Sequence, residues 1–234
     1  MKAPIATWLL PTILLLTLSS PLVLADDGDI SKVNGSIRVE SGRTVGDVET
    51  VNGSIHIEDS VKAGDVETVS GSVTVGRDST VGSVESVNGS ISLDGGAKSG
   101  HLEVVNGDVK LKERVHVAGG VESVNGSIQL DQDTVVDGKL ENVNGGIQLD
   151  RAQARGGIET VNGDIEVGEG SRVEGDIVVK KERGFNFGKK RTPKIVIGPN
   201  AVVTGELRFE REVELHVSKS AKVGKIVGAT PIRD

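Results

Sequence analysis

Cysteine is absent from the 234-residue chain. Its absence excludes disulfides, cysteine-ligated metal sites and a lipid anchor on an N-terminal cysteine. Aromatic residues are almost as scarce, at 2 %, and there is no tyrosine. A rounded globular core is normally filled with large aromatic side chains. The core of this protein must therefore be thin and aliphatic, and it must be held together by packing alone.

The first residues have the pattern of a secretory signal peptide. Lys2 supplies a short basic start, residues 8–18 an apolar run, and Val23-Leu24-Ala25 a small-residue cleavage pattern. The alternative, an uncleaved anchor, is less favoured, because the apolar run is shorter than the ~20 residues of a spanning helix. The sequence predicts a signal peptide over 1–25 and a mature chain over 26–234 without a transmembrane segment. Its expected localisation is the periplasm or the extracellular cell surface.

One five-residue stretch, VNGSI, recurs along most of the chain with small changes. Its first copy begins at Val33, and its Asn, or a Ser in one copy, returns every 18 or 19 residues up to Asn162. A fixed period of this size is typical of a solenoid. Apolar residues lie two apart within each unit, as on strands with one buried face, and no helical spacing appears. The regular repeats span 29–175.

Three turn signals divide each unit: the Asn-Gly pair, a polar break and a closing Gly. The sequence therefore predicts an all-β, single-domain, three-sided β-solenoid of about ten coils with 18–19 residues each. Two columns are expected to be buried. They are Val33, Val51, Val69, Val87, Val105, Val124, Val143 and Val161, and Ile37, Ile55, Val73, Ile91, Val109, Ile128, Ile147 and Ile165. We expect a bend between Val48 and Val51, and hydrogen bonds between stacked Asn side chains.

The repeated text resembles the bacterial adhesin-type and polymer-forming β-solenoid proteins, a group that includes the bactofilins. The resemblance covers residues 29–228 and implies a right-handed β-helix that polymerises end to end. Bactofilins are cytoplasmic filament formers, whereas this chain begins with an export pattern. The two features therefore imply different locations.

Catalytic motifs are not apparent in the sequence. The four His residues occupy different coil positions, and there is no nucleophile motif or phosphate-binding Gly loop. We therefore expect a protein that is not an enzyme and needs no cofactor. The rival is a carbohydrate-acting β-helix enzyme, which would need a groove beside clustered carboxylates. Its candidates are Glu182, Glu206, Glu210, Glu212 and Glu214.

An acidic column recurs at one position in seven consecutive units: Glu49, Glu67, Glu85, Glu103, Glu122, Glu141 and Glu159. If these side chains point outward at ~4.8 Å spacing, neighbours repel by about 0.9 kcal/mol in bulk water. A Ca²⁺ ion would relieve this repulsion. The alternative is a solvated acidic face without a metal.

Residues 180–194 interrupt the repeat as a basic insertion, and 195–234 are expected to form irregular coils and a cap. The insertion carries seven basic side chains and one acidic one, whereas the whole chain has a net charge of −7. Basic and aromatic residues together suit an anionic surface, either lipid headgroups or acidic polysaccharide, with nucleic acid less favoured. The candidates are Lys180, Lys181, Arg183, Phe185, Phe187, Lys189, Lys190, Arg191 and Lys194. The alternative is a solvated loop whose Phe residues cover the end of the core.

The expected function is a rigid envelope scaffold or an adhesin-like surface-binding protein. An end-to-end filament former is the alternative, because the open ends of a solenoid expose unpaired strand edges.

Overall fold

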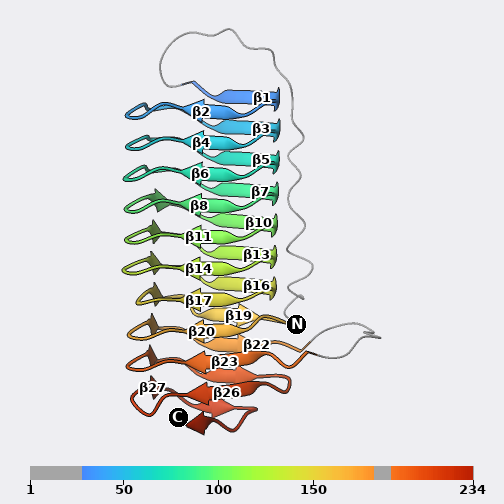
Figure 1. Ribbon diagram of the computed structural model, residues 1–234, viewed down its shortest axis with the longest axis vertical. Coiled ribbons are helices and arrows are strands. Elements are labelled where there is room, and N and C mark those ends of the chain that lie inside the picture. The colour runs from blue at the N-terminus through green and yellow to red at the C-terminus, as the bar shows by residue number, and fades with distance from the viewer. Residues whose placement is uncertain (1–27, 182–190, 234) are drawn as a thin grey trace.

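The protein is a rod of stacked β-coils (Figure 1). The computed structural model describes residues 28–181 and 191–233, and within these ranges it contains strands and turns but no helix. The expected signal peptide, residues 1–25, lies outside the described residues. Each strand pairs in parallel with the equivalent strand of the coil before and the coil after. The prediction of an all-β solenoid is confirmed.

Three sheets form the sides of the rod. Sheet A contains β1 (Ile30–Asn34), β3 (Val48–Asn52), β5 (Val66–Ser70), β7 (Val84–Asn88), β10 (Leu102–Asn106), β13 (Val121–Asn125), β16 (Leu140–Asn144), β19 (Ile158–Thr160), β22 (Ile177–Val179), β25 (Leu207–Phe209) and β28 (Ile226–Val227). Sheet B contains β2 (Ile37–Val39), β4 (Ile55–Ile57), β6 (Val73–Val75), β8 (Ile91–Leu93), β11 (Val109–Leu111), β14 (Ile128–Leu130), β17 (Ile147–Leu149), β20 (Ile165–Val167), β23 (Lys194–Ile197), β26 (Glu214–Val217) and β29 (Ile232–Arg233).

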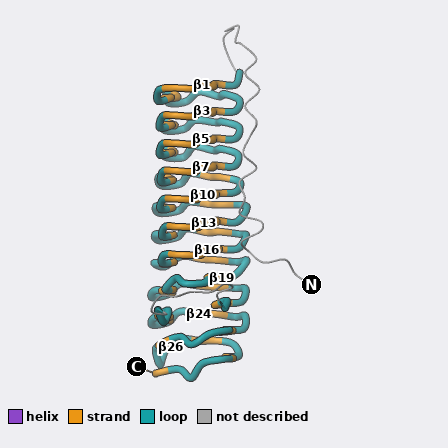
Figure 2. Tube along the Cα trace, turned by 90° about the vertical axis from the view of Figure 1, so that its right-hand side faces the viewer, coloured by secondary structure: helices purple, strands orange, loops and turns teal. Residues whose placement is uncertain are grey.

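Sheet C is the shortest side, with two-residue strands. It contains β9 (Lys98–Ser99), β12 (His116–Val117), β15 (Val135–Val136), β18 (Gln153–Ala154), β21 (Arg172–Val173), β24 (Val202–Val203) and β27 (Lys222–Val223). Single bridges pair Thr44 with Lys62, Lys62 with Thr80, and Thr80 with Lys98, and they continue this side toward the N-terminal coils. Figure 2 shows the coils stacked from β1 to β26. With eleven strands in each long sheet, the rod has about eleven coils, one more than predicted.

The core is aliphatic, as the composition indicates. The predicted column of Ile and Val residues that opens each strand of sheet B is buried throughout, from Ile37 to Ile165. A second buried column closes the same strands, with Ile57 and Leu93 among its members. Equivalent residues pair directly across neighbouring strands, so each buried side chain packs on its counterpart one coil away.

The predicted burial of the Val column was wrong. Val33 and Val69 are 41 % and 44 % exposed, and the other six Val residues of the column are half-buried on the outer face of sheet A. The strand β3 is continuous, without the expected bend, so its side chains alternate strictly. Val48 and Thr50 therefore point inward, whereas Glu49 and Val51 point outward.

In most coils a small polar residue fills the inward position that the Val column was expected to occupy, and Val104 fills it in one coil. Thr50, Thr68 and Ser86 are buried, and each donates its hydroxyl to the carbonyl of the turn Gly in the preceding coil, at 3.0–3.3 Å. Asn142 does the same with its amide, at 2.5 Å from the Gly126 carbonyl. These bonds satisfy turn carbonyls that would otherwise lack a partner inside the rod.

Side-chain ladders tie the coils together along the corner between sheets A and B. The expected Asn ladder is confirmed. Each Asn donates its amide to the amide oxygen one coil before it, from Asn52 to Asn34 and then from Asn162 back to Asn88, at 3.0–3.2 Å. Ser70 replaces Asn in one coil and divides the ladder into two segments.

The Gly of each Asn-Gly pair is required by the stacking of the coils. A Cβ placed on Gly71, Gly89 or Gly126 would lie only 1.9–2.1 Å from the carbonyl oxygen of the Gly one coil before it. No side chain fits at that distance, because backbone atoms on both sides are fixed by the sheets. The repeat of this residue therefore follows from close approach of coil to coil.

The irregular C-terminal coils continue the two long sheets as far as Arg233. Phe209 is 5 % exposed and fills the inward position of the tenth coil. Arg211 reaches back across the insertion and donates to the Val161 carbonyl at 3.1 Å and to Asn162 Oδ1 at 2.6 Å. It therefore binds the last amide of the Asn ladder, where the basic insertion interrupts the corner.

The corrected assignment predicts opposite outcomes for two matched substitutions. Ile91→Asn places an amide in the dry aliphatic column and should lower the free energy of unfolding by at least about 3 kcal/mol. Val124→Asn lies on the half-exposed outer face and should cost less than about 1 kcal/mol. Thermal and denaturant unfolding followed by circular dichroism would measure both values. Equal losses for the two variants would contradict the assignment of inward and outward positions.

Candidate functional site

The acidic column lies on the outer face of sheet A. The seven Glu residues pair in direct register, from Glu49 with Glu67 to Glu141 with Glu159. Their side chains are half-buried, apart from Glu159, which is buried. The half-exposed Val column lies two residues further along the same strands. Sheet A thus presents an acidic column beside an apolar one.

A second acidic column borders the N-terminal half of the first one. Asp29, Asp47 and Asp65 precede the strands of sheet A, and each accepts the backbone N–H of the equivalent residue one coil later, at 2.7–3.0 Å. These carboxylates are held in place by the stacking and cannot move away from the Glu column. The face is therefore most acidic along β3 and β5, where an Asp precedes the strand and a Glu lies on it.

Burial and like charge raise the pKa values of this column. For Glu67, burial is the largest cause, followed by the charges of Glu85 and Glu49, and together with the nearby Asp residues they raise the pKa to about 7. Burial first, and then neighbouring carboxylates, also raise the pKa of Glu49, Glu103 and Glu122. The protonated carboxyl is thus favoured on this face above the ordinary range of a glutamic acid.

The C-terminal half of the column is neutralised by lysines of the chain itself. Lys139 Nζ lies 3.0 Å from Glu141 and 3.4 Å from Glu159, and Lys180 Nζ lies 2.7 Å from the other oxygen of Glu159. His101 lies 3.8 Å from Glu122. Within the described residues, no ion pair is formed by Glu49, Glu67, Glu85 or Glu103. The column is therefore divided into a neutralised half and an uncompensated half.

No group of three or more His, Asp and Glu side chains converges as a metal site in the described part of the chain. The carboxylates of the column lie in a line rather than around a point, whereas Ca²⁺ takes six to eight oxygens from all sides. The predicted Ca²⁺ site of the seven Glu residues stays a prediction.

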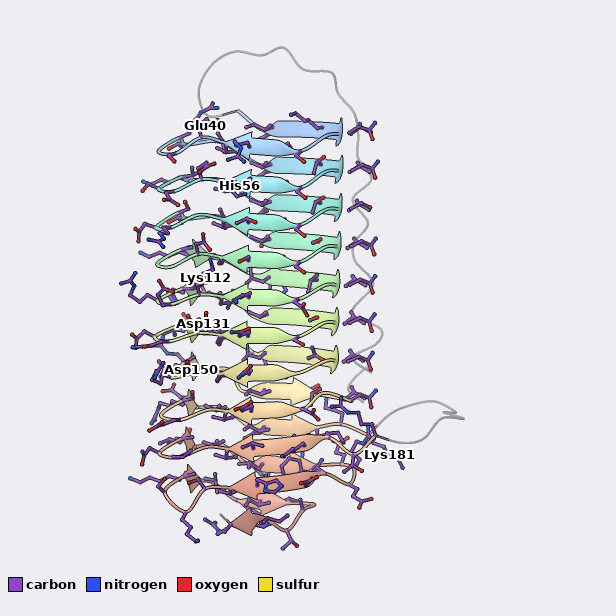
Figure 3. The ribbon with its side chains drawn as sticks, in the orientation of Figure 1. Glu40, His56, Lys112, Asp131, Asp150 and Lys181 are labelled. Atoms are coloured by element: carbon purple, nitrogen blue, oxygen red, sulfur yellow. The ribbon has the colours of Figure 1, made fainter. Side chains whose placement is uncertain are left out.

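The predicted anion-binding residues are placed only in part. Arg183, Phe185, Phe187, Lys189 and Lys190 lie outside the described residues. Lys180 is bound to Glu159 and Arg191 forms an ion pair with Asp164, so both take part in contacts within the chain. Lys181 and Lys194 are exposed at the two ends of the insertion. Figure 3 shows Lys181 on the side of the rod opposite to Lys112, Asp131 and Asp150.

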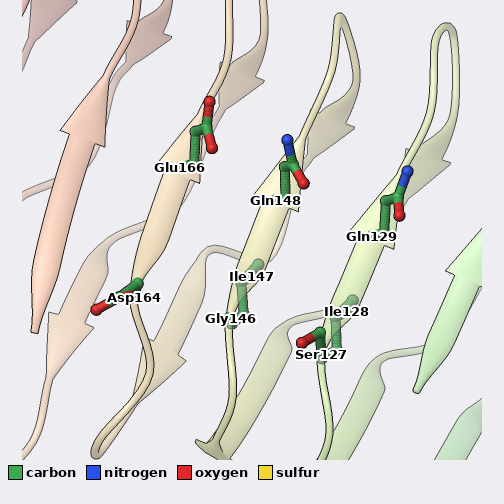
Figure 4. A pocket seen from close by; sticks show the side chains of 8 residues that line it. All are labelled: Ser127, Ile128, Gln129, Gly146, Ile147, Gln148, Asp164 and Glu166. Atoms are coloured by element: carbon green, nitrogen blue, oxygen red, sulfur yellow. The ribbon is translucent and has the colours of Figure 1, made fainter.

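A shallow depression lies on the outer face of sheet B (Figure 4). Gln129, Gln148 and Glu166 project from β14, β17 and β20, and Ser127, Gly146 and Asp164 lie at the start of these strands. Gly146 stands where most coils carry Ser or Asp, and its missing side chain leaves the hollow. The carboxylates considered for a carbohydrate-acting enzyme are not among its lining residues.

Those carboxylates do not converge where the structure describes them. Glu206 lies 3.5 Å from Lys225, Glu214 lies 2.6 Å from His216, and Glu210 accepts the backbone N–H of Lys181 at 3.4 Å. Glu206 precedes a strand of sheet A and Glu214 belongs to sheet B, and Glu182 lies outside the described residues. The four His residues are each beside a different carboxylate, as expected from their scattered positions.

Comparisons with known proteins give no match. No family model, no curated protein and no solved structure matches this chain. In addition, no helix in the described ranges has the length and apolar character needed to cross a membrane.

Sequence reasoning missed the partners of the acidic column. Lys139 and Lys180 neutralise its C-terminal half, but neither recurs in the repeat. The sequence did contain one indication for Lys139. It stands directly before its strand, at the same position as His101 two coils earlier, so both place a basic side chain beside the acidic column. The outward position of the Val column was also missed. In most coils a Thr or Ser directly precedes the Val, and neighbouring residues of a strand point to opposite faces.

The raised pKa values predict that stability falls as pH rises. The folded protein holds protons on Glu67 more tightly than the unfolded chain, so this stabilisation is complete below about pH 4.5 and is lost as the pH rises through about 7. Glu67→Gln mimics the protonated carboxyl and should raise the melting temperature above pH 7 while flattening its dependence on pH. Glu166→Gln, on the exposed outer face of sheet B, is the matched control. A melting temperature that does not change between pH 4.5 and pH 7 would contradict the raised pKa of Glu67.

The Ca²⁺ hypothesis predicts a separate effect. Millimolar Ca²⁺ should raise the melting temperature of the parent protein, and changing Glu85, Glu103 and Glu122 to Gln should abolish this rise. Mg²⁺ serves as the control for simple screening, since it requires a tighter octahedral site. A parent protein indifferent to Ca²⁺ would leave the column as a solvated acidic face.

Proposed function

We propose that the protein is an exported, non-enzymatic β-solenoid that acts as a rigid scaffold or adhesin-like binding protein of the bacterial envelope. The observation that carries this proposal is the unbroken stack of about eleven coils. At ~4.8 Å per coil the rod is roughly 50 Å long. Every coil is fixed to its neighbours by backbone and side-chain ladders, which suits a spacer or a binding surface.

The shape of the side walls supports a role without catalysis. From Asp29 to Gly175 the coils differ by at most one residue in length, so no long loops build a cleft there. The depression at Gly146 is shallow and open. Two carboxylates line it, Asp164 and Glu166, and the first of them is already engaged in contacts within the chain. Asp164 is bound to Arg191 and to the Lys194 backbone N–H, at 2.9 Å for the latter. A catalytic pair of carboxylates would need both groups free to reach a substrate.

The basic insertion is the contact site of this proposal. It carries a charge of +6 on a chain whose net charge is −7, so an anionic surface is attracted to it and repelled by the rest of the rod. Its ends leave the rod at the corner between sheets A and B, after Val179 and before Lys194. The described ends of the insertion, at Lys181 and Arg191, therefore lie at the same corner of the rod, and we propose that the segment between them is the part that meets the anionic surface.

The end-to-end filament remains a second candidate because the terminal strands are exposed. Val227 and Ile232, in the last strands of sheets A and B, are 36 % and 50 % exposed, and each strand has a partner on one side only. An unpaired parallel strand edge is a template for the first coil of another molecule. Negative-stain microscopy separates the candidates: long filaments favour polymerisation, and short rods of uniform length favour the monomeric binding protein.

The proposed contact site predicts salt-sensitive binding to anionic surfaces. The protein should bind vesicles containing an anionic lipid, or an acidic polysaccharide, at low salt and lose this binding as salt screens the charges. Lys181→Ser with Lys189→Ser and Lys190→Ser should remove the binding without changing the melting temperature. Lys62→Ser with Lys98→Ser and Lys110→Ser is the control with the same change of charge on other faces. Binding that survives the first set of changes would show that the insertion is not the contact site.

A further inference from the structure

The corner between sheets A and B carries seven Asn-Gly pairs, a dipeptide whose amide is chemically labile. In such a pair the backbone nitrogen of the Gly can attack the side-chain amide carbon of the Asn, because Gly has no side chain to hinder the approach. The seven are Asn34, Asn52, Asn88, Asn106, Asn125, Asn144 and Asn162. The reacting residues are the same in every pair, so the fold decides which of them is exposed to this reaction.

In five of these pairs the stacking of the coils occupies the attacking nitrogen. The Gly N–H donates to a backbone carbonyl one coil later, at 2.8–3.0 Å. The five donors are Gly35, Gly53, Gly89, Gly107 and Gly126. An N–H in such a bond is released only when the coils open locally. The native stack therefore protects these five pairs.

The last pair is protected in a different way. Gly163 is buried, and its N–H donates to the Thr160 hydroxyl at 2.9 Å. Arg211 donates to Asn162 Oδ1 at 2.6 Å. The amide of Asn162 in turn donates to Asn144 Oδ1 at 3.0 Å, so both ends of its side-chain amide are held. The nucleophile and the amide of this pair are therefore both engaged.

Gly145, in the sixth pair, is the exception. In the part of the chain that the structure describes, its N–H has no hydrogen-bond partner. The cause lies in the next coil, where the pairing of β16 with β19 ends at Asn142 and Thr160. In the regular coils this pairing continues to the Asn, whose carbonyl accepts the Gly N–H, but here it does not reach Asn162. The nucleophile of this pair is unoccupied.

The residue that follows leaves the same turn open to water. Gly146 stands where most coils carry Ser or Asp, and it borders the depression on sheet B (Figure 4). At the equivalent position, Ser90 and Ser127 donate their N–H to the side chain one coil earlier, at 3.2 and 2.7 Å. Among the described residues the Gly146 N–H has no such partner. Asn144 itself is exposed, so solvent reaches the reacting groups.

We propose that Asn144 is a modification site, the Asn of the ladder that deamidates first in the folded protein. Solvent hydroxide removes the proton of the Gly145 nitrogen, which attacks Cγ of Asn144 and closes a five-membered succinimide ring. The side-chain nitrogen takes a proton from water and leaves as ammonia. A further water molecule opens the ring on either side of its nitrogen, which gives aspartate or isoaspartate. This reaction does not depend on the proposed function.

The product breaks the Asn ladder at this coil. Asn144 donates its amide to Asn125 Oδ1 at 3.0 Å, whereas a carboxylate has no proton to donate. Isoaspartate also adds a backbone atom in a closely packed turn, where a Cβ on Gly145 would already lie 2.2 Å from the Gly126 carbonyl oxygen. Modification therefore loosens the contact between two coils and adds a negative charge to the corner.

Peptide mapping by mass spectrometry tests the site in the purified, folded protein. After incubation at mildly alkaline pH, Asn144 should be deamidated at least about tenfold faster than Asn106 and Asn125, whose Gly N–H groups must first be released from a hydrogen bond. The same protein in guanidinium chloride is the matched control. It keeps the local sequences and removes the stacking, so the rates of the seven pairs should become similar.

Hydrogen exchange gives a readout that does not depend on deamidation. The Gly145 amide should exchange at least about tenfold faster than the Gly126 amide. Asn144→Gln keeps an amide at the corner and should remove the fast deamidation, whereas Asn125→Gln should retain it, with circular dichroism melting to verify that both are folded. An Asn144 that reacts no faster than Asn125 in the folded parent protein, or a Gly145 amide as protected as that of Gly126, would overturn the proposal.

Discussion

The spacing of about 4.8 Å between successive coils is the constraint on which the rest of the structure depends. Parallel backbone pairing fixes this distance on all three sides, so every residue lies directly above its counterpart one period earlier. At each position the favoured residue is therefore one whose side chain packs well against the same residue one coil away. Aliphatic side chains, Asn amides and bare Gly residues satisfy this condition well, which explains both the repeated text of the sequence and its scarcity of aromatic residues.

The same constraint is unfavourable for charge. Seven Glu residues in register cannot increase their separation, and the Asp residues beside them are held by backbone N–H groups of the next coil. In the C-terminal half, Lys139 and Lys180 relieve the repulsion. In the N-terminal half no lysine does so, and burial and like charge raise the pKa of Glu67.

The architecture was predictable because the period of the repeat and the Asn-Gly corners are local features of the sequence. The column from Ile37 to Ile165 was predicted correctly, since apolar residues two apart define one face of a strand. The Val column was assigned to the wrong face, because Thr50 and its equivalents are polar and yet buried. Their hydroxyls bind turn carbonyls one coil away, and that acceptor becomes visible only once the coils are stacked. The partners of the acidic column, Lys139 and Lys180, escaped prediction for a related reason: neither belongs to the repeat, and each acts on a residue of a different coil.

The Asn ladder has an electrical consequence. From Asn106 to Asn162 each amide donates to the Asn oxygen one coil nearer the N-terminal end of the rod, and the first acceptor is Asn88, so the side-chain dipoles align head to tail. Aligned peptide dipoles give an α-helix a partial negative charge at its C-terminal end, where cations are stabilising. The oxygen of Asn162 is the corresponding negative end of this column, and the guanidinium of Arg211 binds it at 2.6 Å. A ladder of neutral side chains thus gives one edge of the rod the polarity of a helix, and Arg211 is the cation that caps it.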